Sequence, residues 1–174
     1  MLNYFVPDYY IESYKLLNIE KLKENGIKLL ICDIDNTLVP HDQQHMDEDA
    51  KAFLEKVIAS GLEVVLVSNN TKERVDLFAK DHHISTYPFA KKPLKKTYRV
   101  MLQEYPYQPN QVAALGDQLL TDIFGGNRMG FYTILTNPLV KKDLSFTKIN
   151  RFFEMIIFNL LKWTHKLEKG NYHD

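Results

Sequence analysis

The stretch KLLICDIDNTLVPHD, at residues 28–42, joins a strand-like apolar run to two aspartates. The run covers Leu29–Ile34, and Asp33 and Asp35 lead from it into the polar pair Asn36-Thr37. Side chains repeat with a period of two along an extended chain, so these two carboxylates point roughly the same way. Like charges this close repel, and holding both requires a nearby cation or a separation of their pKa values. The stretch therefore predicts a buried strand that ends in a functional site.

Strand-like and helix-like patterns alternate after this stretch. Leu29–Ile34 is bounded by polar turns, as in a strand buried on both faces. The elements expected next are a helix over Asp47–Ser60 closed by Gly61, a strand over Leu62–Ser68, a helix that begins after Asn69-Asn70-Thr71, a strand over 83–89, a helix from Pro93 to Glu104, a strand over 112–117, a helix from about Leu119 and a strand over 131–135. This alternation predicts an α/β fold: a three-layer, Rossmann-like parallel sheet with helices on both faces.

Length and composition favour a single domain. The chain has 174 residues, of which 45% are hydrophobic and 25% are charged, as in ordinary soluble globular proteins. We divide it into an N-terminal extension that packs on the core (1–27), a core (28–140) and an amphipathic C-terminal helical segment (141–174). Lys plus Arg and Asp plus Glu balance at 22 each, so no excess of positive charge points to a nucleic acid partner.

The single cysteine, Cys32, lies in the first strand and is expected to be a small core side chain. One cysteine excludes an intrachain disulfide and a cysteine-based zinc site, which favours a reducing compartment. The first ten residues, MLNYFVPDYY, lack the basic and apolar regions of a signal peptide. No stretch reaches the ~18 apolar residues of a membrane span. We therefore expect a cytoplasmic protein.

Polar side chains end several strands at the edge where parallel sheets bind ligands. Asp33 and Asp35 end the first strand, Ser68 ends the second and Asp117 ends the fourth. Mg²⁺ prefers oxygen ligands and typically takes one or two carboxylates together with substrate phosphate. Asp122 offers an outer-shell partner, and the Ser68 hydroxyl can donate a hydrogen bond to a phosphate oxygen. The pattern predicts a magnesium and phosphate site.

Positive charge for a phosphate comes from Lys91 and Lys92, directly before Pro93. A carboxylate nucleophile, a carboxylate acid and base, magnesium, a hydroxyl and a lysine together form an apparatus for phosphoryl transfer. His41 and His45 also follow the first motif, but solvated loop histidines are commoner than ligands, so we expect neither to act.

Four motifs in order resemble those of haloacid dehalogenase superfamily phosphatases. They are DIDNT at 33–37, VSNN at 67–70, KKP at 91–93 and GDQLLTDIFGGN at 116–127. The resemblance covers about residues 28–135, and four motifs on the expected strands are far more specific than the first motif alone. It implies a magnesium-dependent phosphate monoester hydrolase with the corresponding fold.

The resemblance also implies a role for each motif residue. Asp33 would be the nucleophile that forms an aspartyl-phosphate. Asp35 would protonate the leaving group, then activate the hydrolytic water, and lend its backbone carbonyl to magnesium. Asp117 would ligate magnesium with the help of Asp122. The residues implied at the phosphate are Ser68 as a binding hydroxyl, Lys92 as the lysine that neutralises developing charge, and Thr37, Asn69 and Lys91 in supporting or substrate-binding positions, with Lys91 the less favoured lysine.

The spacing of the motifs leaves no room for a cap domain. The segments between Asp35 and Ser68 and between Ser68 and Lys92 are each used up by a helix and a strand. An open site favours a large or surface-held substrate. The phrases ICDIDNTLVPHD and KKPLKK resemble the YqeG-type, subfamily IIIA branch, which is similar to phosphatidylglycerophosphate phosphatases.

Two other functions fit the same residues. A non-catalytic phosphate-binding or regulatory module would also gather acids, a hydroxyl and a lysine, although a signalling receiver carries its phosphorylated Asp on the third strand. A phosphatase for phosphoproteins, nucleic-acid ends or sugar phosphates is the second alternative. The acid and base pair of Asp33 and Asp35 favours turnover over binding, and the neutral charge gives no help with nucleic acid.

The C-terminal segment carries a long apolar stripe at helical spacing. The stripe runs from Ile149 through Phe152, Phe153, Ile156, Ile157, Leu160, Leu161, Thr164 and Leu167, with Met155, Phe158 and Trp163 beside it. Residues 141–169 contain seven Lys or Arg and three Asp or Glu. A helix that is apolar on one side and basic on the other can lie on an anionic membrane, so we expect residues 148–169 to contact phospholipid at the cytoplasmic face. Packing on this domain or on a second subunit in a homo-oligomer explains the stripe equally well.

Overall fold

The computed structural model describes residues 2–80, 82–140 and 147–173, with the backbone alone for 147–151. Six strands form one sheet in the order β1-β6-β5-β2-β3-β4, and every neighbouring pair is parallel. The strands are β1 (Tyr9–Ile11), β2 (Leu29–Cys32), β3 (Glu63–Val67), β4 (Ser85–Tyr87), β5 (Val112–Gly116) and β6 (Tyr132–Thr136). The parallel α/β fold predicted from the sequence is confirmed.

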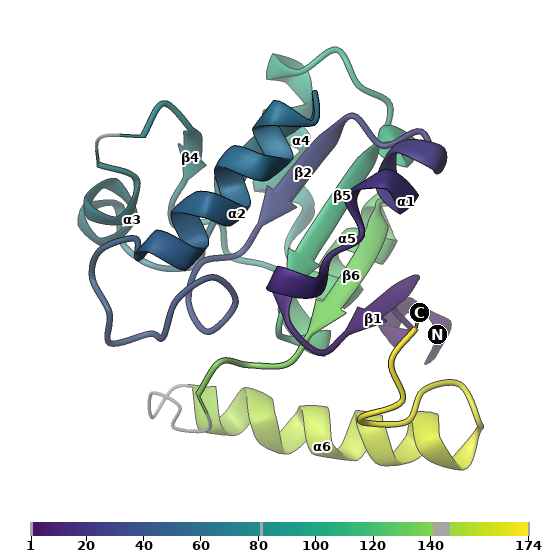
Figure 1. Ribbon diagram of the computed structural model, residues 1–174. Helices are drawn as coiled ribbons and strands as arrows, with labels where there is room; N and C mark the ends of the chain where they lie inside the picture. Colours follow the sequence, from purple (N-terminus) through teal and green to yellow (C-terminus); the bar gives the residue numbers. More distant parts are fainter. Residues whose placement is uncertain (1, 81, 141–146, 174) are drawn as a thin grey trace.

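Helices cover both faces of this sheet (Figure 1). The α-helices are α1 (Ile19–Glu24), α2 (Glu48–Ala59), α3 (Lys72–Ala79), α4 (Lys95–Glu104), α5 (Phe124–Met129) and α6 (Thr147–Trp163). Short 3-10 helices are η1 (Leu2–Phe5), η2 (Tyr14–Leu16) and η3 (Pro109–Gln111), and η4 (Leu119–Ile123) is a π-helical turn. Figure 1 shows α1 and α2 in front of the sheet, α4 and α5 behind it, and α6 beside the carboxyl ends of β6 and β1.

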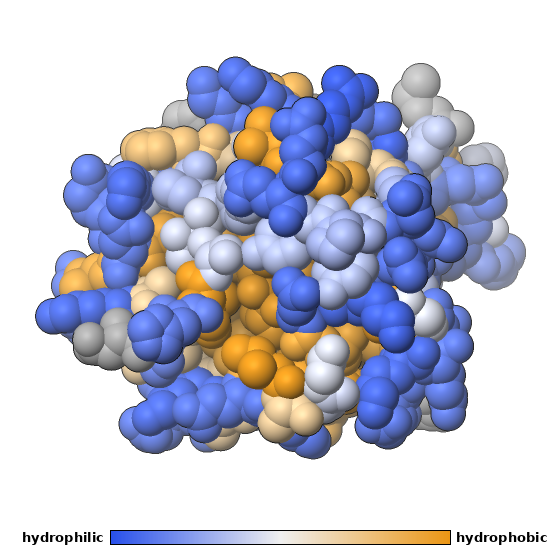
Figure 2. All heavy atoms as spheres, turned by 90° about the horizontal axis from the view of Figure 1, so that it is seen from above, coloured by the Kyte–Doolittle hydropathy of each residue, from blue (hydrophilic) through white to orange (hydrophobic). Residues whose placement is uncertain are grey.

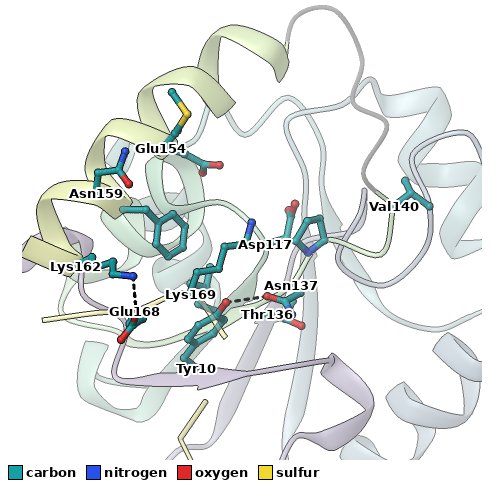
Figure 3. Close-up of a pocket in the computed structure, with 14 residues that line it drawn as sticks. Tyr10, Asp117, Thr136, Asn137, Val140, Glu154, Asn159, Lys162, Glu168 and Lys169 are labelled. Carbon is teal, nitrogen blue, oxygen red and sulfur yellow. Dashed lines mark hydrogen bonds and ion pairs between the residues drawn. The ribbon is translucent and has the colours of Figure 1, made fainter. Parts of the chain in front are cut away.

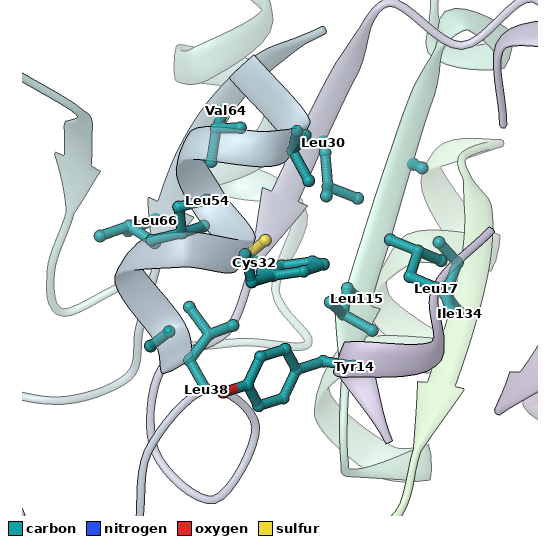
Figure 4. Packing of buried hydrophobic residues seen from close by; sticks show 14 of the residues in the cluster. Tyr14, Leu17, Leu30, Cys32, Leu38, Leu54, Val64, Leu66, Leu115 and Ile134 are labelled. Atoms are coloured by element: carbon teal, nitrogen blue, oxygen red, sulfur yellow. The ribbon is translucent and has the colours of Figure 1, made fainter. Parts of the chain in front are cut away.

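Strand β2 supplies side chains to both faces because alternate residues point in opposite directions. Leu30 and Cys32 pack with the helix α2 side, as Figure 4 shows for the large cluster around Cys32. Leu29 and Ile31 pack in a second cluster with Tyr98 of α4. All four strand residues are buried, and burial raises the pKa of the Cys32 thiol, so this cysteine is a core residue as predicted.

Both chain ends join the sheet through a third cluster. Tyr10 of β1, Leu135 of β6 and Leu161 of α6 share it with residues of η1 and η4. The N-terminal extension therefore does more than pack on the core, because β1 adds an edge strand that the sequence did not predict. The C-terminal tail follows β1, where the His173 backbone N–H donates to the Tyr10 carbonyl at 2.8 Å.

Most helix boundaries follow their capping residues. Asp47 caps α2 by accepting a hydrogen bond from the Ala50 N–H at 2.8 Å, and Gly61 follows the helix with a positive φ of 92°. Thr71 caps α3, as predicted. The prediction that Pro93 opens a helix was wrong by two residues, because Lys91–Leu94 forms a turn that precedes α4.

The links between strands concern substrate access, and the lengths of the helices and the outer surface concern membrane binding. Within the described ranges, the links from β2 to β3 and from β3 to β4 each contain one helix, and neither holds a cap domain. No helix of the described residues is long and apolar enough to cross a membrane. Seen from above, away from α6, hydrophilic side chains surround an apolar area near the centre of the face (Figure 2).

Candidate active site

The predicted site residues lie where strand order reverses, at the carboxyl ends of β2 and β5. The Asp33 N–H donates to the Leu115 carbonyl at 2.9 Å, which holds the end of β2 against β5. Asp117 directly follows β5, and Ser68 directly follows β3 on the other side of β2. Parallel α/β sheets bind ligands at this edge.

Lys92 ties together two of the buried aspartates. Its Nζ lies 2.6 Å from Asp33 Oδ1 and 2.6 Å from Asp122 Oδ1. All three side chains are at least nine-tenths shielded from solvent. Charges removed from water are held only when paired, so this trio is rigidly specified. The structure brings together Asp33, Lys92 and Asp122 as the motifs predicted.

The protonation of this trio reflects its burial. Burial would by itself lower the pKa of Lys92, but the carboxylates of Asp122 and Asp33 outweigh it and raise the pKa above its usual range. Burial raises the pKa of Asp33 to about 7, Lys92 opposes the rise, and Asp122 and Asp35 add to it.

Asp33, Asp117 and Asp122 form a buried group of carboxylates. Each offers one oxygen, and these three oxygens all lie within 4.8 Å of one another. The Thr37 hydroxyl lies between two of them, 3.2 Å from Asp33 Oδ2 and 3.4 Å from Asp117 Oδ1. Asp33 and Asp122 share the ammonium of Lys92, and the three carboxylates converge on a buried space. A hard divalent cation fits this donor set.

A close backbone approach places Asp122 in this group. Asp122 lies in the π-helical turn η4, and its Oδ2 accepts hydrogen bonds from the Gln118 N–H and the Thr121 hydroxyl, both at 3.2 Å. A Cβ added to Gly116 would lie only 2.2 Å from Asp122 Cγ. Gly116 at the end of β5 is therefore needed to let this carboxylate reach Lys92.

The carboxylate of Asp35 has a different set of partners. Its Oδ1 accepts from Arg74 Nη2 at 3.0 Å, and its Oδ2 accepts from Asn70 Nδ2 at 3.2 Å and from the Ser68 hydroxyl at 3.4 Å. Arg74 also donates to the Gln44 carbonyl at 2.9 Å, which fixes the guanidinium. Asp35 thus lies outside the group of carboxylates that could hold a metal ion, and any metal ligation by Asp35 would use its backbone carbonyl.

The two lysines of the KKP motif are placed differently. Asn69 holds the backbone of Lys92 from both sides: its Oδ1 accepts from the Lys92 N–H at 2.6 Å, and its Nδ2 donates to the Lys92 carbonyl at 3.2 Å. Lys91 is exposed and has a positive φ of 53°. Lys92 is therefore the lysine that the turn delivers into the site.

These residues surround a cavity of about 260 Å³ that is open to solvent. Its lining contains Asp33, Asp35, Asn36, His41, Ser68, Asn69, Asn70, Lys92, Gln118 and Thr121. The sequence reasoning missed Asn70 and Arg74 as partners of Asp35, although Asn70 ends the VSNN motif and Arg74 lies four residues after it. It also placed His41 in solvent, whereas the residue is half-buried and lines the cavity.

Comparisons with known proteins agree with this geometry. Residues 2–140 match the family model described as mitochondrial PGP phosphatase. The chain is 36% identical over 159 residues to the probable phosphatase YqeG of Bacillus subtilis (strain 168), covering 91% of this chain and 92% of that protein. It is 24% identical over 177 residues to phosphatidylglycerophosphate phosphatase 1, chloroplastic/mitochondrial, of Arabidopsis thaliana, covering 94% of this chain and 49% of that relative, about half its length.

A solved structure supports the fold. A putative HAD superfamily (subfamily III A) hydrolase from Legionella pneumophila aligns with a TM-score of 0.51 at 19% identity. The alignment covers 69% of this chain and 71% of that one. The resemblance drawn from the four motifs is confirmed: the chain belongs to the mitochondrial PGP phosphatase family and is a phosphatase of the haloacid dehalogenase type.

Proposed function

We propose that this phosphatase removes the terminal phosphate of phosphatidylglycerophosphate to give phosphatidylglycerol, using Mg²⁺ and a phosphorylated Asp33. One observation carries the chemistry. The two carboxylates of the DIDNT stretch have separate cationic partners, Lys92 for Asp33 and Arg74 for Asp35. Such a division suits two carboxylates with different tasks in one reaction.

The first half of the reaction would use both carboxylates. An Asp33 oxygen attacks the phosphorus atom, the bond from phosphorus to the ester oxygen breaks, and Asp35 gives that oxygen its proton. Lys92 and the Ser68 hydroxyl are placed to bind phosphoryl oxygens, since both line the cavity above Asp33. The product is an acyl phosphate on Asp33 and a free alcohol.

The second half would release phosphate. Asp35, now ionised, takes a proton from water, the water oxygen attacks phosphorus, and the Asp33 carboxylate leaves. Arg74 and Asn70 hold the Asp35 carboxylate in place for both proton transfers. The group Asp33, Asp117 and Asp122 would hold Mg²⁺, which when bound supplies positive charge to the phosphoryl oxygens.

The lipid substrate is supported by three features. The family model and the Arabidopsis thaliana relative both name this substrate class. The cavity is open, without a cap domain in the described chain, so a substrate anchored in a membrane could reach it. The helix α6 lies beside the carboxyl ends of β6 and β1 (Figure 1), and several of its large apolar side chains are exposed.

We further propose that this outer face of α6 lies on an anionic membrane. Its large apolar side chains are 40–80% exposed. They are Phe152, Phe153, Ile156, Leu160 and Trp163. Among residues 152–163, the opposite side of α6 includes Leu161 and Glu154, which are buried against the domain. Lys162 and Lys166 are exposed and flank the apolar face, whereas the side chains of Lys148 and Arg151 lie outside the described residues.

A substrate panel tests the proposed reaction. Purified protein is assayed with Mg²⁺ on phosphatidylglycerophosphate in mixed micelles, a phosphopeptide, a sugar phosphate, a 5′-phosphorylated oligonucleotide and p-nitrophenyl phosphate. We expect phosphate release from the lipid to exceed that from the other biological esters. Asp33→Asn and excess EDTA are the controls, and each should abolish turnover. Better hydrolysis of a soluble ester than of the lipid would contradict the proposed substrate while leaving the phosphatase chemistry intact.

Vesicle flotation tests the membrane contact. Binding should require anionic lipid, weaken with added salt and fall sharply in the double variant Phe152→Ser and Trp163→Ser. Leu16→Ser is the matched control, because Leu16 is 61% exposed and belongs to η2, not to α6. Equal losses in both variants would show that the effect does not come from α6.

A further inference from the structure

A second cavity of about 510 Å³ lies between α6 and the carboxyl ends of the strands, next to the catalytic one. Asp117, which belongs to the metal-binding carboxylates, also lines this second space, and the following residue, Gln118, lines the catalytic cavity. We call this space the α6 cavity. Figure 3 shows Asp117 at one side of it and the α6 residues Glu154 and Asn159 at the other. Consecutive residues, Asp117 and Gln118, therefore line the two cavities.

The lining of the α6 cavity combines a polar floor with an apolar roof. On the floor, the Tyr10 hydroxyl donates to Asn137 Oδ1 at 2.8 Å, at the ends of β1 and β6. The roof is formed by apolar side chains of α6, Met155 and Phe158. A space of this size and composition suits an amphipathic organic group.

One cation is directed into the α6 cavity. Lys169 follows α6, and its side chain extends toward Asp117 (Figure 3). Lys162 also lines the space, but its Nζ is paired with Glu168 Oε1 at 2.7 Å. Lys169 has no carboxylate within ion-pair distance among the described residues. Lys169 is thus available for an anionic group. Glu154, in the opposite wall, accepts a hydrogen bond from the Leu120 N–H at 3.4 Å.

The position of the α6 cavity matches the rest of a lipid substrate. β5 separates β2 from β6, and neighbouring strands are ~4.8 Å apart, so the end of β6 lies about 10 Å from the end of β2. A phosphate bound over Asp33 would leave the three-carbon glycerol bridge to cross toward β6. The phosphodiester at the far end of that bridge would then meet Lys169, and the first part of the acyl chains would meet the apolar roof.

We propose that the α6 cavity binds the non-reacting part of the substrate, namely the phosphodiester and the adjoining segment of a glycerophospholipid. This inference rests on the proposed function. It gives α6 two roles: the outer face contacts the membrane and the inner face helps to enclose the headgroup. It also makes Lys169 a residue that determines specificity without touching the reacting phosphate.

The experiment compares Lys169→Gln with Lys166→Gln on three substrates. Both changes remove one positive charge from the same segment, but Lys166 does not line the α6 cavity and instead donates to Asn3 Oδ1 at 2.6 Å. The substrates are diacyl phosphatidylglycerophosphate, its deacylated headgroup and p-nitrophenyl phosphate. We expect Lys169→Gln to raise KM about tenfold for the first two, through loss of a charge-assisted contact, and to leave p-nitrophenyl phosphate unchanged. Lys166→Gln should leave the headgroup unchanged.

Each outcome separates the inference from the function on which it rests. If the wild type hydrolyses the lipid and Lys169→Gln behaves like the wild type, the α6 cavity is not the binding site. The α6 cavity is also excluded if Lys166→Gln and Lys169→Gln have equal effects on the headgroup, because surface charge alone would then explain them. If the wild type hydrolyses p-nitrophenyl phosphate but neither the lipid nor its headgroup, the proposed substrate itself is wrong.

Discussion

The Asp33 side and the Asp35 side of the site differ in their cations and in their exposure. Asp33 lies in a buried trio with Lys92 and Asp122, whereas Asp35 is partly exposed beside Arg74. The two carboxylates are close neighbours in the chain and both line the cavity, yet they have different cationic partners. The proposed reaction gives each of these two acids at the end of a buried strand a different task.

The lysine pair gives the largest expected effect on the Asp33 side. Lys92→Ala should lower kcat by about 10³-fold, since it removes a buried charge that faces the phosphoryl group. Lys91→Ala should change kcat by less than about twofold, because Lys91 is exposed. Steady-state rates with p-nitrophenyl phosphate measure both. A larger loss in Lys91→Ala would overturn the assignment, and circular dichroism checks that Lys92→Ala is folded.

Asp35→Asn tests the other side of the comparison. The variant should lose about 10²-fold in steady-state rate, the usual contribution of an acid and base catalyst. With p-nitrophenyl phosphate, whose leaving group needs no proton, the first half of the reaction should survive. Rapid mixing should then show a burst of about one p-nitrophenolate per enzyme before a slow phase. If no burst appears and the first turnover is as slow as the later ones, the separation of roles between Asp33 and Asp35 is contradicted.

The pH dependence of metal binding probes the buried group on the Asp33 side. The pKa of Asp33 is raised to about 7, so in the metal-free protein this carboxyl gains a proton as the pH falls below that value. A cation must displace that proton, and the apparent Mg²⁺ affinity should therefore fall up to about tenfold per pH unit below about 7. Calorimetry at about pH 6 and about pH 8 measures this. Equal affinities would exclude a protonated Asp33, and Asp33→Asn should remove the dependence.

Arg74 should give the smallest effect, because it acts only by positioning Asp35. Arg74→Ala should lower the steady-state rate about tenfold and keep the burst with p-nitrophenyl phosphate, as Asp35→Asn does. Arg74→Lys should recover part of the loss. Arg99→Ala, an exposed arginine on α4, is the matched control and should resemble the wild type. A change in the burst amplitude would point to a role on the Asp33 side.

The sequence predicted the parts of the fold that repeat a strong local pattern. The continuous apolar runs of β2, β3 and β5 and the capping residues Asp47 and Thr71 were readable directly. β1 was missed because three residues are too few to show a period, and because its stability comes from β6 and the C-terminal tail.

In the site and in α6 too, local sequence patterns were readable, whereas contacts that depend on packing were not. Apart from Asn70, the contact residues within the ordered motifs were found, and the structure brings Asp33, Lys92, Asp117 and Asp122 together. Arg74 was not, because it reaches Asp35 from the first turn of another helix. The stripe on α6 could not show which side faces the domain, since large apolar residues occur on both; only packing separates buried Leu161 from exposed Trp163.

Detection of a covalent phosphate on Asp33 is the most direct test of the separate roles proposed for Asp33 and Asp35. The Asp35→Asn variant, which lacks the base for the second half of the reaction, is mixed with Mg²⁺ and substrate, quenched in acid and treated with borohydride. Borohydride reduces an acyl phosphate to an alcohol, so peptide mass spectrometry should find homoserine at position 33. Unmodified aspartate at position 33 in a variant that still shows the p-nitrophenolate burst, or a modification at another acid, would contradict the assignment of Asp33 as the nucleophile.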